Sequence, residues 1–373
     1  MPSAANLFGL DYRAEAARLG PPPVPITDAH THVGGLEAHK VFDGVRRLFG
    51  VARVYSMTPL AQAAAVRDTF GPDLRFIAVP DWNDPDRATA FRAGFLRQIE
   101  AFHRDFGSRI LKLWASPRFR DLLPDGRVDL WDLDSRWRIE ACKLGESLGM
   151  MYMVHVADPD TWFATRYADT GKYLTKREHY LPLERMLDRF GAPWIAAHLG
   201  GWPEDLDFLD GLLGRHPNLA LDTSATKWMV RELSKHPHER LRAFLSRWRG
   251  RLLFGSDLVV TDDHLRPAKQ TTSPMADLAD SPEAAFELYA SRYWALRTMW
   301  ETAYDGPSPI ADPDLAMVDP ARHTPLDSPR LAGRALPREL LAELYAGAAD
   351  RVLGAWWEKG RPTGVGVAPA PAR

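Results

Sequence analysis

Short apolar runs recur along the chain, and each of them ends on polar or small residues. Eight such runs are rich in β-branched or aromatic residues and are bounded by Gly, Pro or polar clusters, a pattern typical of buried strands. They span residues 25–32, 52–57, 75–80, 109–115, 150–156, 193–199, 218–223 and 251–257. The pattern therefore predicts eight β-strands.

Segments with helical spacing of apolar residues separate these runs. Residues 86–107, 130–149 and 181–191 each end on a glycine, which supplies the left-handed residue that ends many helices. Residues 231–250 are expected to contain a second helix start at His236-Pro237. Strands that alternate with helices predict an α/β protein with a parallel sheet, and eight of them favour a closed (β/α)8 barrel. An open, doubly wound sheet is the alternative, although no Gly-x-Gly-x-x-Gly turn follows the first strand.

The segments between these elements predict the domain organisation. We expect an N-terminal extension (1–23), one barrel domain (24–357) and a disordered tail (358–373). The connections after the fifth and eighth strands, 158–180 and 259–282, are long enough to form lids over a site. Additional C-terminal helices are expected to start at Ser281-Pro282 and to cover residues 337–354.

Composition and net charge limit the cellular compartment and the classes of binding partner that we expect. The formal net charge of −2 gives no basic excess for nucleic acid or for anionic membranes. Cys142 is the single cysteine, so a reducing compartment is expected, and its helical surroundings favour a small core residue. The first 20 residues lack a secretory pattern, and no apolar run approaches the ~20 residues of a membrane span. We therefore expect a soluble cytoplasmic protein.

The first strand carries two histidines two positions apart, in "ITDAHTHVGG" (26–35). Because side chains alternate faces along a strand, His30 and His32 point the same way, with Asp28 one step earlier on that face. Neutral imidazole is the commonest metal-binding side chain. The pair is thus a candidate for half of a metal site, with Asp28 as support below it. The alternative is a pair of histidines satisfied by hydroxyl or carboxylate groups.

Three other strands also end on a residue that can bind a metal. His155 ends "MYMVH", His198 ends "PWIAAH" and Asp257 ends "LLFGSD". Barrel enzymes build their sites at these carboxyl ends of the strands. Four histidines and one aspartate would therefore meet at one mouth, as N and O ligands that suit zinc and also iron, manganese or nickel.

These motifs resemble the amidohydrolase superfamily, in the amidohydrolase-related branch that includes aminocarboxymuconate-semialdehyde decarboxylase. The resemblance rests on "DAHTH", "MVHVAD", "AAHLGG" and "LLFGSD" in that order and on the closing helix "LLAELYAGAADRVLG", and it covers about residues 24–353. The motif order is specific for the superfamily and much less specific for the reaction.

The resemblance implies a role for each residue. His30, His32 and His155 would bind a divalent metal, with Asp257 as a further ligand or the general base. His198 would bind a second metal or act as an acid/base that orients the substrate. One or two ions, Zn²⁺ first and Mn²⁺ or Fe²⁺ as alternatives, would activate a water for attack.

Lys112 lies inside the fourth apolar run, where a charge without a partner is costly. In two-metal members of the superfamily, a lysine on this strand is carboxylated and bridges the metals. The alternative is a plain lysine that binds a substrate carboxylate or pairs with an acid. A role in the site is favoured over a purely structural one.

Aromatic and cationic residues cluster just beyond the strand ends. The aromatic ones are Trp82, Trp114, Trp162, Trp202 and Trp228, and the cationic ones are Arg118, Arg166, Lys227 and Arg231. Taken singly, each tryptophan can be a large apolar residue that packs a loop against the barrel rim, and each cation can be a solvated surface residue. Together they favour a small organic substrate that is flat or apolar in part and carries a carboxylate.

Two reactions fit these residues. The first is hydrolysis of an amide, lactone or ester-like bond by a metal-activated water, with Asp257, His198 and Lys112 as catalytic residues. The second is non-oxidative decarboxylation of an aromatic or unsaturated acid, with Asp257 or His198 protonating the carbon. Hydrolysis is favoured slightly, and a catalytically silent binding barrel is the third hypothesis. A homodimer is expected by analogy with the family.

Overall fold

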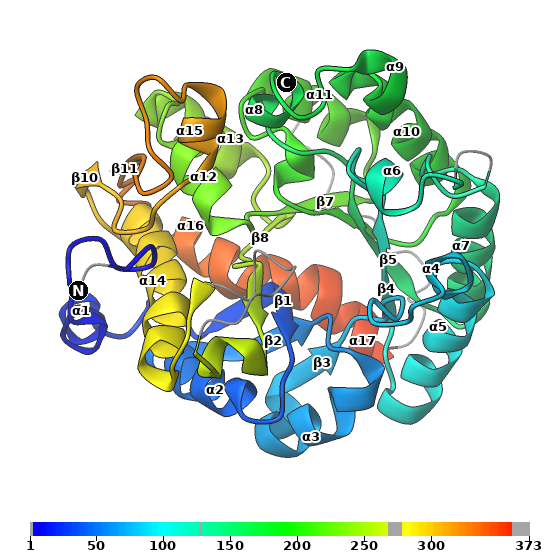
Figure 1. The fold of residues 1–373 in the computed structure, drawn as a ribbon, viewed down its shortest axis with the longest axis horizontal. Coiled ribbons are helices and arrows are strands. Elements are labelled where there is room, and N and C mark those ends of the chain that lie inside the picture. Colours follow the sequence, from blue (N-terminus) through cyan, green and yellow to red (C-terminus); the bar gives the residue numbers. More distant parts are fainter. Residues whose placement is uncertain (1–2, 127–128, 268–277, 360–373) are drawn as a thin grey trace.

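Short strands alternate with helices along the chain, and the helices lie around the outside of the strands (Figure 1). This computed structural model describes residues 3–126, 129–267 and 278–359. The strands are β1 (Ile26–Val33), β2 (Val51–Ser56), β3 (Leu74–Phe76), β4 (Ile110–Trp114), β5 (Met151–His155), β6 (Trp194–Ala196), β7 (Leu219–Asp222), β8 (Leu252–Leu253), β9 (Leu258–Val260), β10 (Asp305–Pro307) and β11 (Arg330–Ala332). All eight predicted strand positions are confirmed as β1 to β8.

The strands form two parallel sheets and one antiparallel pair. One sheet has the order β3-β2-β1-β9 and the other β4-β5-β6-β7-β8, while β10 pairs with β11. Neighbours within each parallel sheet run in the same direction. The prediction of an α/β fold with parallel strands is confirmed, whereas the strands are assigned to two sheets rather than to one continuous barrel.

Backbone hydrogen bonds connect the two sheets at both margins. Beyond β3, an isolated parallel bridge joins Ala78 to Leu111 of β4. Beyond β8, the Phe254 carbonyl accepts a 2.9 Å hydrogen bond from the Ala29 amide of β1. Because β3 has three residues and β8 has two, the regular ladder stops before each junction. The strands therefore form two ladders joined by single contacts.

The helices are distributed over the whole chain. They are α1 (Tyr12–Leu19), α2 (Ala38–Leu48), α3 (Leu60–Phe70), α4 (Arg87–Ala90), α5 (Ala93–Phe106), α6 (Phe119–Leu122), α7 (Arg136–Ser147), α8 (Asp160–Phe163), α9 (Thr170–Tyr173), α10 (Tyr180–Arg189), α11 (Leu206–Arg215), α12 (Thr226–Leu233), α13 (His238–Arg247), α14 (Pro282–Glu301), α15 (Asp314–Val318), α16 (Arg338–Ala342) and α17 (Ala355–Lys359). None of these described helices is both long and apolar enough to cross a membrane.

Most predicted helix boundaries are close to the observed ones. Gly107 has a left-handed φ of 62° and ends α5, as its position predicts. The segment 86–107 nevertheless forms two helices, because Arg92 leaves the helical region with a ψ of −115°. Pro237 separates α12 from α13, and the Ser281 hydroxyl caps α14 by accepting the Ala284 amide.

The two expected lids are only partly irregular. Residues 158–180 contain α8, α9 and a 3-10 turn at Lys176–His179. The connection after β8 contains β9 and a 3-10 turn at Asp262–Leu265, while residues 268–277 lie outside the described residues. The predicted disordered tail lies outside them as well, from residue 360 onward.

Two terminal segments lie against each other. The Leu7 amide donates to the Pro309 carbonyl at 2.9 Å, and the Ala311 amide donates to the Ala4 carbonyl at 2.8 Å. Helix α1 packs on α14, where the Tyr12 ring lies 6.5 Å from that of Trp294. The residues before β1 therefore support the segment that leads into α15.

Candidate metal centre

The carboxyl ends of β1 and β8 bring three candidate ligands together. The Nε2 atoms of His30 and His32 both lie 3.2 Å from the Oδ1 atom of Asp257. The alternation of side chains along β1 points both imidazoles toward this carboxylate. These three side chains form one group whose ligand atoms can all reach a single cation.

Asp257 reaches this position through an uncommon backbone conformation. Its φ is 58°, and its amide donates to the His30 carbonyl at 2.8 Å. Gly255 permits the approach, since a Cβ there would lie 3.1 Å from the Cβ of His30. Strained conformations of this kind gather at functional sites, where the surrounding structure maintains them.

Asp28 supports the strand from below, as the sequence predicts. Its Oδ1 atom accepts the His30 and Ser256 amides at 3.1 and 3.0 Å, and its Oδ2 atom accepts the Tyr293 hydroxyl at 2.8 Å. Burial raises the pKa of this carboxyl to about 6. Asp28 thus ties β1 to the end of β8 without facing the candidate ligands.

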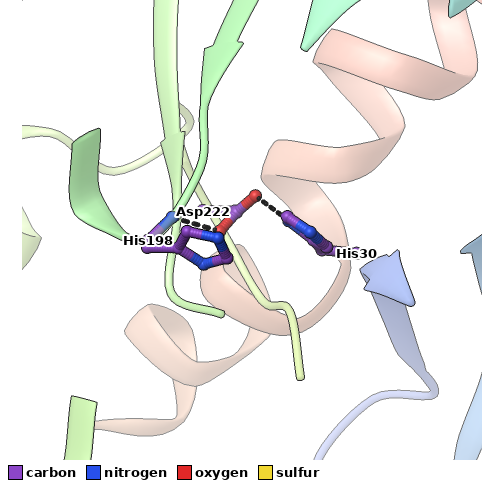
Figure 2. Close-up of side chains that lie close together, drawn as sticks. All are labelled: His30, His198 and Asp222. Carbon is purple, nitrogen blue, oxygen red and sulfur yellow. Dashed lines mark hydrogen bonds and ion pairs between the residues drawn. The ribbon is translucent and has the colours of Figure 1, made fainter. Parts of the chain in front are cut away.

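A second group lies behind His30 and consists of His30, His198 and Asp222 (Figure 2). The Oδ2 atom of Asp222 accepts the His30 Nδ1 proton at 2.8 Å, and its Oδ1 atom accepts the His198 amide at 2.9 Å. His198 follows β6 with a left-handed φ of 59°. All three side chains are buried.

Hydrogen bonds distinguish the two groups. Asp222 also accepts the Ser224 amide and hydroxyl, so its oxygens are already occupied. Because the His30 Nδ1 atom donates to Asp222, the Nε2 atom is left to face His32 and Asp257. A carboxylate that orients a histidine in this way is the usual outer partner of a metal ligand. The geometry therefore favours His30, His32 and Asp257 as ligands and Asp222 as the group that positions them.

Sequence reasoning missed Asp222 and Ser224. The signal was present, since Asp222 ends the seventh apolar run just as Asp257 ends the eighth. The Ser224 oxygen accepts the His198 Nδ1 proton at 2.8 Å while its own hydroxyl donates to Asp222. One carboxylate and one hydroxyl thus orient both His30 and His198.

The charges around His30 favour a cation. Burial and Lys112 lower the pKa of His30, but the carboxylates of Asp222 and Asp257 outweigh them and raise it. Burial raises the pKa of Asp257, yet the neighbouring histidines bring it well below its usual range. The carboxylates of Asp222 and Asp257 thus stabilise positive charge next to His30. The same environment would stabilise a divalent metal ion bound by imidazole nitrogens.

Lys112 projects from β4 toward the same histidine. Its Nζ atom lies 3.4 Å from the His30 Nε2 atom, and its side chain is 6% exposed. Burial lowers the pKa of its ammonium to about 8, against the attraction of Asp222 and Asp257. Within the described residues it has no carboxylate at ion-pair distance, so the predicted pairing with an acid is an interaction at longer range.

Lys112→Met is expected to raise the free energy of unfolding of the metal-free protein at pH 7 by about 2–3 kcal/mol. The unfolded chain keeps a lysine pKa near 10.5, whereas the folded protein has a pKa of about 8 at this position. Wild-type stability therefore rises between about pH 8 and pH 10.5, and the advantage of methionine fades over that window. Urea unfolding at pH 7 and pH 10 measures the change, and an equal advantage at both values would contradict it.

His155 lies beside this centre but belongs to neither group. Its Nε2 atom bonds to the Asp158 Oδ1 atom at 2.7 Å, and its ring lies 4.6 Å from that of His198. Asp158, which the sequence analysis did not single out, also accepts the hydroxyls of Ser116 and Tyr167 at 2.6 Å each. Metal binding by His155 would require this contact to change or the other ring nitrogen to bind, and it stays a prediction.

A cavity of about 450 Å³ opens above Asp257 and His155. Trp114, Trp162 and Trp228 line it, together with Arg118, Arg166 and Lys227. These six residues are therefore placed where the sequence analysis expected them. Arg292 of α14 also lines the cavity and was missed, because nothing in the sequence of α14 brings that helix to the site.

Three other predicted cavity residues lie elsewhere. Trp82 packs edge-on against Trp114, with ring centroids 5.2 Å apart, behind the cavity wall. Trp202 stacks on Tyr180 at 5.5 Å, away from the cavity lining. Arg231 is buried in ion pairs with Glu232, Asp312 and Asp314. Its prediction as a substrate-gripping cation is not supported, because three carboxylates already surround its guanidinium.

Asp222→Asn is expected to weaken Zn²⁺ affinity by about 10–100-fold, because the amide no longer accepts the His30 proton as a charged partner. Competition with a chromophoric chelator measures the affinity. Asp207→Asn on the exposed face of α11 is the matched control and should bind Zn²⁺ like the wild type. Unchanged affinity in Asp222→Asn would assign the carboxylate a role in folding alone.

Comparison with known proteins finds similarity at the level of structure. No family model and no curated protein matches the sequence. An amidohydrolase from Burkholderia multivorans with bound zinc is 12% identical, with a TM-score of 0.42, over 88% of this chain and 98% of that one. The 2,6-dihydroxybenzoate decarboxylase from Rhizobium is 12% identical, with a TM-score of 0.40, over 73% and 99%. The 5-carboxyvanillate decarboxylase from Novosphingobium aromaticivorans, in complex with manganese, is also 12% identical, with a TM-score of 0.40, over 92% and 97%.

The similar structures are amidohydrolases and decarboxylases. One fold can support different reactions, so the chain's own side chains must identify the reaction.

Proposed function

We propose that the protein is a metal-dependent hydrolase of a small organic acid. The observation that carries this proposal is the group of His30, His32 and Asp257, whose ligand atoms face one another and of which Asp257 lines a cavity of about 450 Å³. We also propose that the two sheets act as one closed eight-stranded barrel. The hydrogen bonds at Ala78 and Phe254, which link the sheets on both sides, support this.

His30, His32 and Asp257 would bind the ion, and Zn²⁺ is our first choice because two imidazoles and a carboxylate suit it. A bound divalent ion supplies an acidified water and polarises a substrate carbonyl. His155 and His198 are the candidates for further ligands. The rings of His30 and His198 lie 4.9 Å apart, so both imidazoles can serve the same reaction centre.

Asp257 is the proposed general base. Its carboxylate lines the cavity, and the surrounding histidines hold the pKa low enough to keep it ionised at neutral pH. It would take a proton as the water oxygen bonds to the carbonyl carbon, and return it to the leaving oxygen or nitrogen as that bond breaks. Burial keeps the pKa of His198 well below its usual value, so a neutral imidazole would orient the substrate. Lys112 would add positive charge beside the developing oxyanion.

The cavity lining supports a flat acid as substrate. Trp114, Trp162 and Trp228 provide apolar, planar surface. Arg118, Arg166, Lys227 and Arg292 provide positive charge, and no carboxylate of the described chain lies within 4.0 Å of any of their charged groups. Arg292 is only 9% exposed. Cations without a carboxylate at ion-pair distance in a partly enclosed space favour a ligand that brings its own carboxylate.

The same lining also favours decarboxylation of an aromatic acid, which is our second candidate. Two product assays separate the reactions. Hydrolysis of aryl lactones or aryl esters releases acid that a pH-stat detects, and decarboxylation of hydroxybenzoates releases carbon dioxide that a coupled assay detects. Carbon dioxide release without acid release would overturn hydrolysis in favour of the second candidate. Neither product, in protein loaded with Zn²⁺ or Mn²⁺, would reject both.

Lys227→Gln combined with Arg292→Gln is expected to weaken binding of benzoate by about 10–100-fold, since each substitution removes a charged donor from the cavity. Isothermal titration calorimetry measures the affinity. Lys235→Gln, at an exposed position just after α12, is the control and should leave the affinity unchanged. Equal benzoate affinity in the double variant would remove these two cations from the substrate site.

A further inference from the structure

A segment without helical or strand periodicity forms part of the cavity wall. Residues 306–336 follow α14 and contain the short helix α15, and Pro313, Asp314 and Met317 line the cavity. Helix α15 also contacts α8, which carries Trp162 (Figure 1). A C-terminal segment therefore meets the connections that follow β5 and β7.

Asp314 accepts hydrogen bonds from two tryptophans of this wall. Its Oδ2 atom lies 2.9 Å from the Nε1 atom of Trp162 and 3.1 Å from that of Trp228. The two indoles touch edge to face, with ring centroids 6.1 Å apart and planes at 73°. One carboxylate oxygen thus fixes the orientation of both rings, although the three residues come from three separate segments.

The carboxylate is itself fixed by a buried guanidinium. The Nη1 atom of Arg231 lies 3.2 Å from the Asp314 Oδ2 atom, and Arg231 also pairs with Asp312 and Glu232. Asp314 is 8% exposed and Arg231 is 3% exposed. A buried carboxylate with two N–H donors and an ion pair has one favourable position, since any shift leaves charged or polar atoms unpaired.

The oriented indoles reach the histidines of the candidate centre. The Trp228 ring lies edge to face against His198, with centroids 5.6 Å apart, and against His155 at 6.3 Å. Trp228 therefore separates Asp314 from the imidazoles. The position of the Asp314 carboxylate therefore sets the position of the Trp228 ring relative to His155 and His198.

We infer that Asp314 is a positioning residue that makes the cavity selective for planar acids, because it fixes the indoles of Trp162 and Trp228 as one rigid wall. This inference rests on the proposed function only in that the cavity binds the substrate. A planar acid can stack on or meet the edge of a fixed ring, whereas a saturated ring of equal charge and similar size gains less from the same surface. Because both indoles are already ordered in the free protein, ligand binding does not incur the entropy cost of ordering them.

Calorimetric titration with benzoate and cyclohexanecarboxylate tests the inference without turnover. We expect the wild type to bind benzoate about tenfold more tightly than cyclohexanecarboxylate. Asp314→Leu should bring this ratio close to one, while Asp314→Asn should retain most of it, because the amide oxygen still accepts an indole proton. Glu232→Gln is the matched control, since Glu232 pairs with the same Arg231 without a hydrogen bond to Asp314 or to either indole, and it should keep the wild-type ratio.

Two outcomes would overturn the inference. A wild type that binds the two acids equally, or binds neither, shows no selectivity to explain. If Asp314→Leu keeps the wild-type ratio of the two affinities, the indoles of Trp162 and Trp228 do not need the carboxylate to select planar acids. Should Asp314→Leu fail to fold, Asp314→Ala replaces it, and a ratio in Asp314→Ala equal to that in Glu232→Gln would reject a specific role. Metal content and hydrolysis of the wild type are measured in parallel, and the absence of either would reject the proposed function and leave this ratio as a separate result.

Discussion

A protein in which His30 and His32 are both replaced by alanine is expected to fold and to lose its divalent metal almost entirely. The two imidazoles supply both nitrogens of the group that faces Asp257, and the remaining carboxylate cannot retain the ion alone. Turnover should fall on the order of 10³-fold or more, because the acidified water and the polarisation of the carbonyl are lost together. Elemental analysis of protein purified with added Zn²⁺ measures the first effect, and initial rates measure the second.

The matched control is His238→Ala, at an exposed position at the start of α13. It should bind metal in the wild-type ratio. Far-ultraviolet circular dichroism of both proteins confirms that folding is retained. A double variant that still contains one equivalent of metal would reject His30 and His32 as ligands, and would direct attention to His155, His198 and Asp222.

Replacing Asp257 by asparagine is expected to lower the turnover rate by about 10²–10⁴-fold, the usual contribution of a general base. Asparagine keeps the size of the side chain and an oxygen that can face His30 and His32, so the metal should bind more weakly without being excluded. The rate is therefore measured at saturating Zn²⁺. A shift in metal affinity alone, with full rate once the site is saturated, would assign Asp257 as a ligand and deny it the role of base.

Asp263→Asn is the control for this substitution, since Asp263 lies on the same connection after β8 and faces solvent. Its rate and metal affinity should equal those of the wild type.

The strands and the first candidate ligands could be predicted from the sequence because both depend on local pattern. A short apolar run between turn residues is a strand in most contexts, and the polar residue that ends it must lie at the sheet edge. His30, His32 and Asp257 follow from that argument alone. His198 does as well, although its contact with Ser224 depends on how β6 and β7 pair.

Other features depend on contacts between distant segments. Asp222 has the same local signal as Asp257, but its bond to His30 joins the first and seventh strands and cannot be read from either. Arg292 and Asp314 reach the cavity because α14 and α15 fold back over it, in a part of the chain with little periodicity. Arg231 was a candidate for a carboxylate-binding or a solvated surface cation, and the sequence does not show that two of its three acidic partners come from that same segment.

The pairing of residues 4–7 with residues 309–311 bears on the order in which the protein folds. The candidate ligands also depend on a long-range contact, because His30 and His32 on β1 meet Asp257 through the pairing of β1 with β9. The wall that contains Asp314 is supported by a contact across a still longer stretch of chain, between residues 4–7 and 309–311, and contacts of this kind form slowly. Because a chain is made from its N-terminus, Asp257 is available before residues 309–318, so the candidate ligands can meet before the substrate cavity is complete.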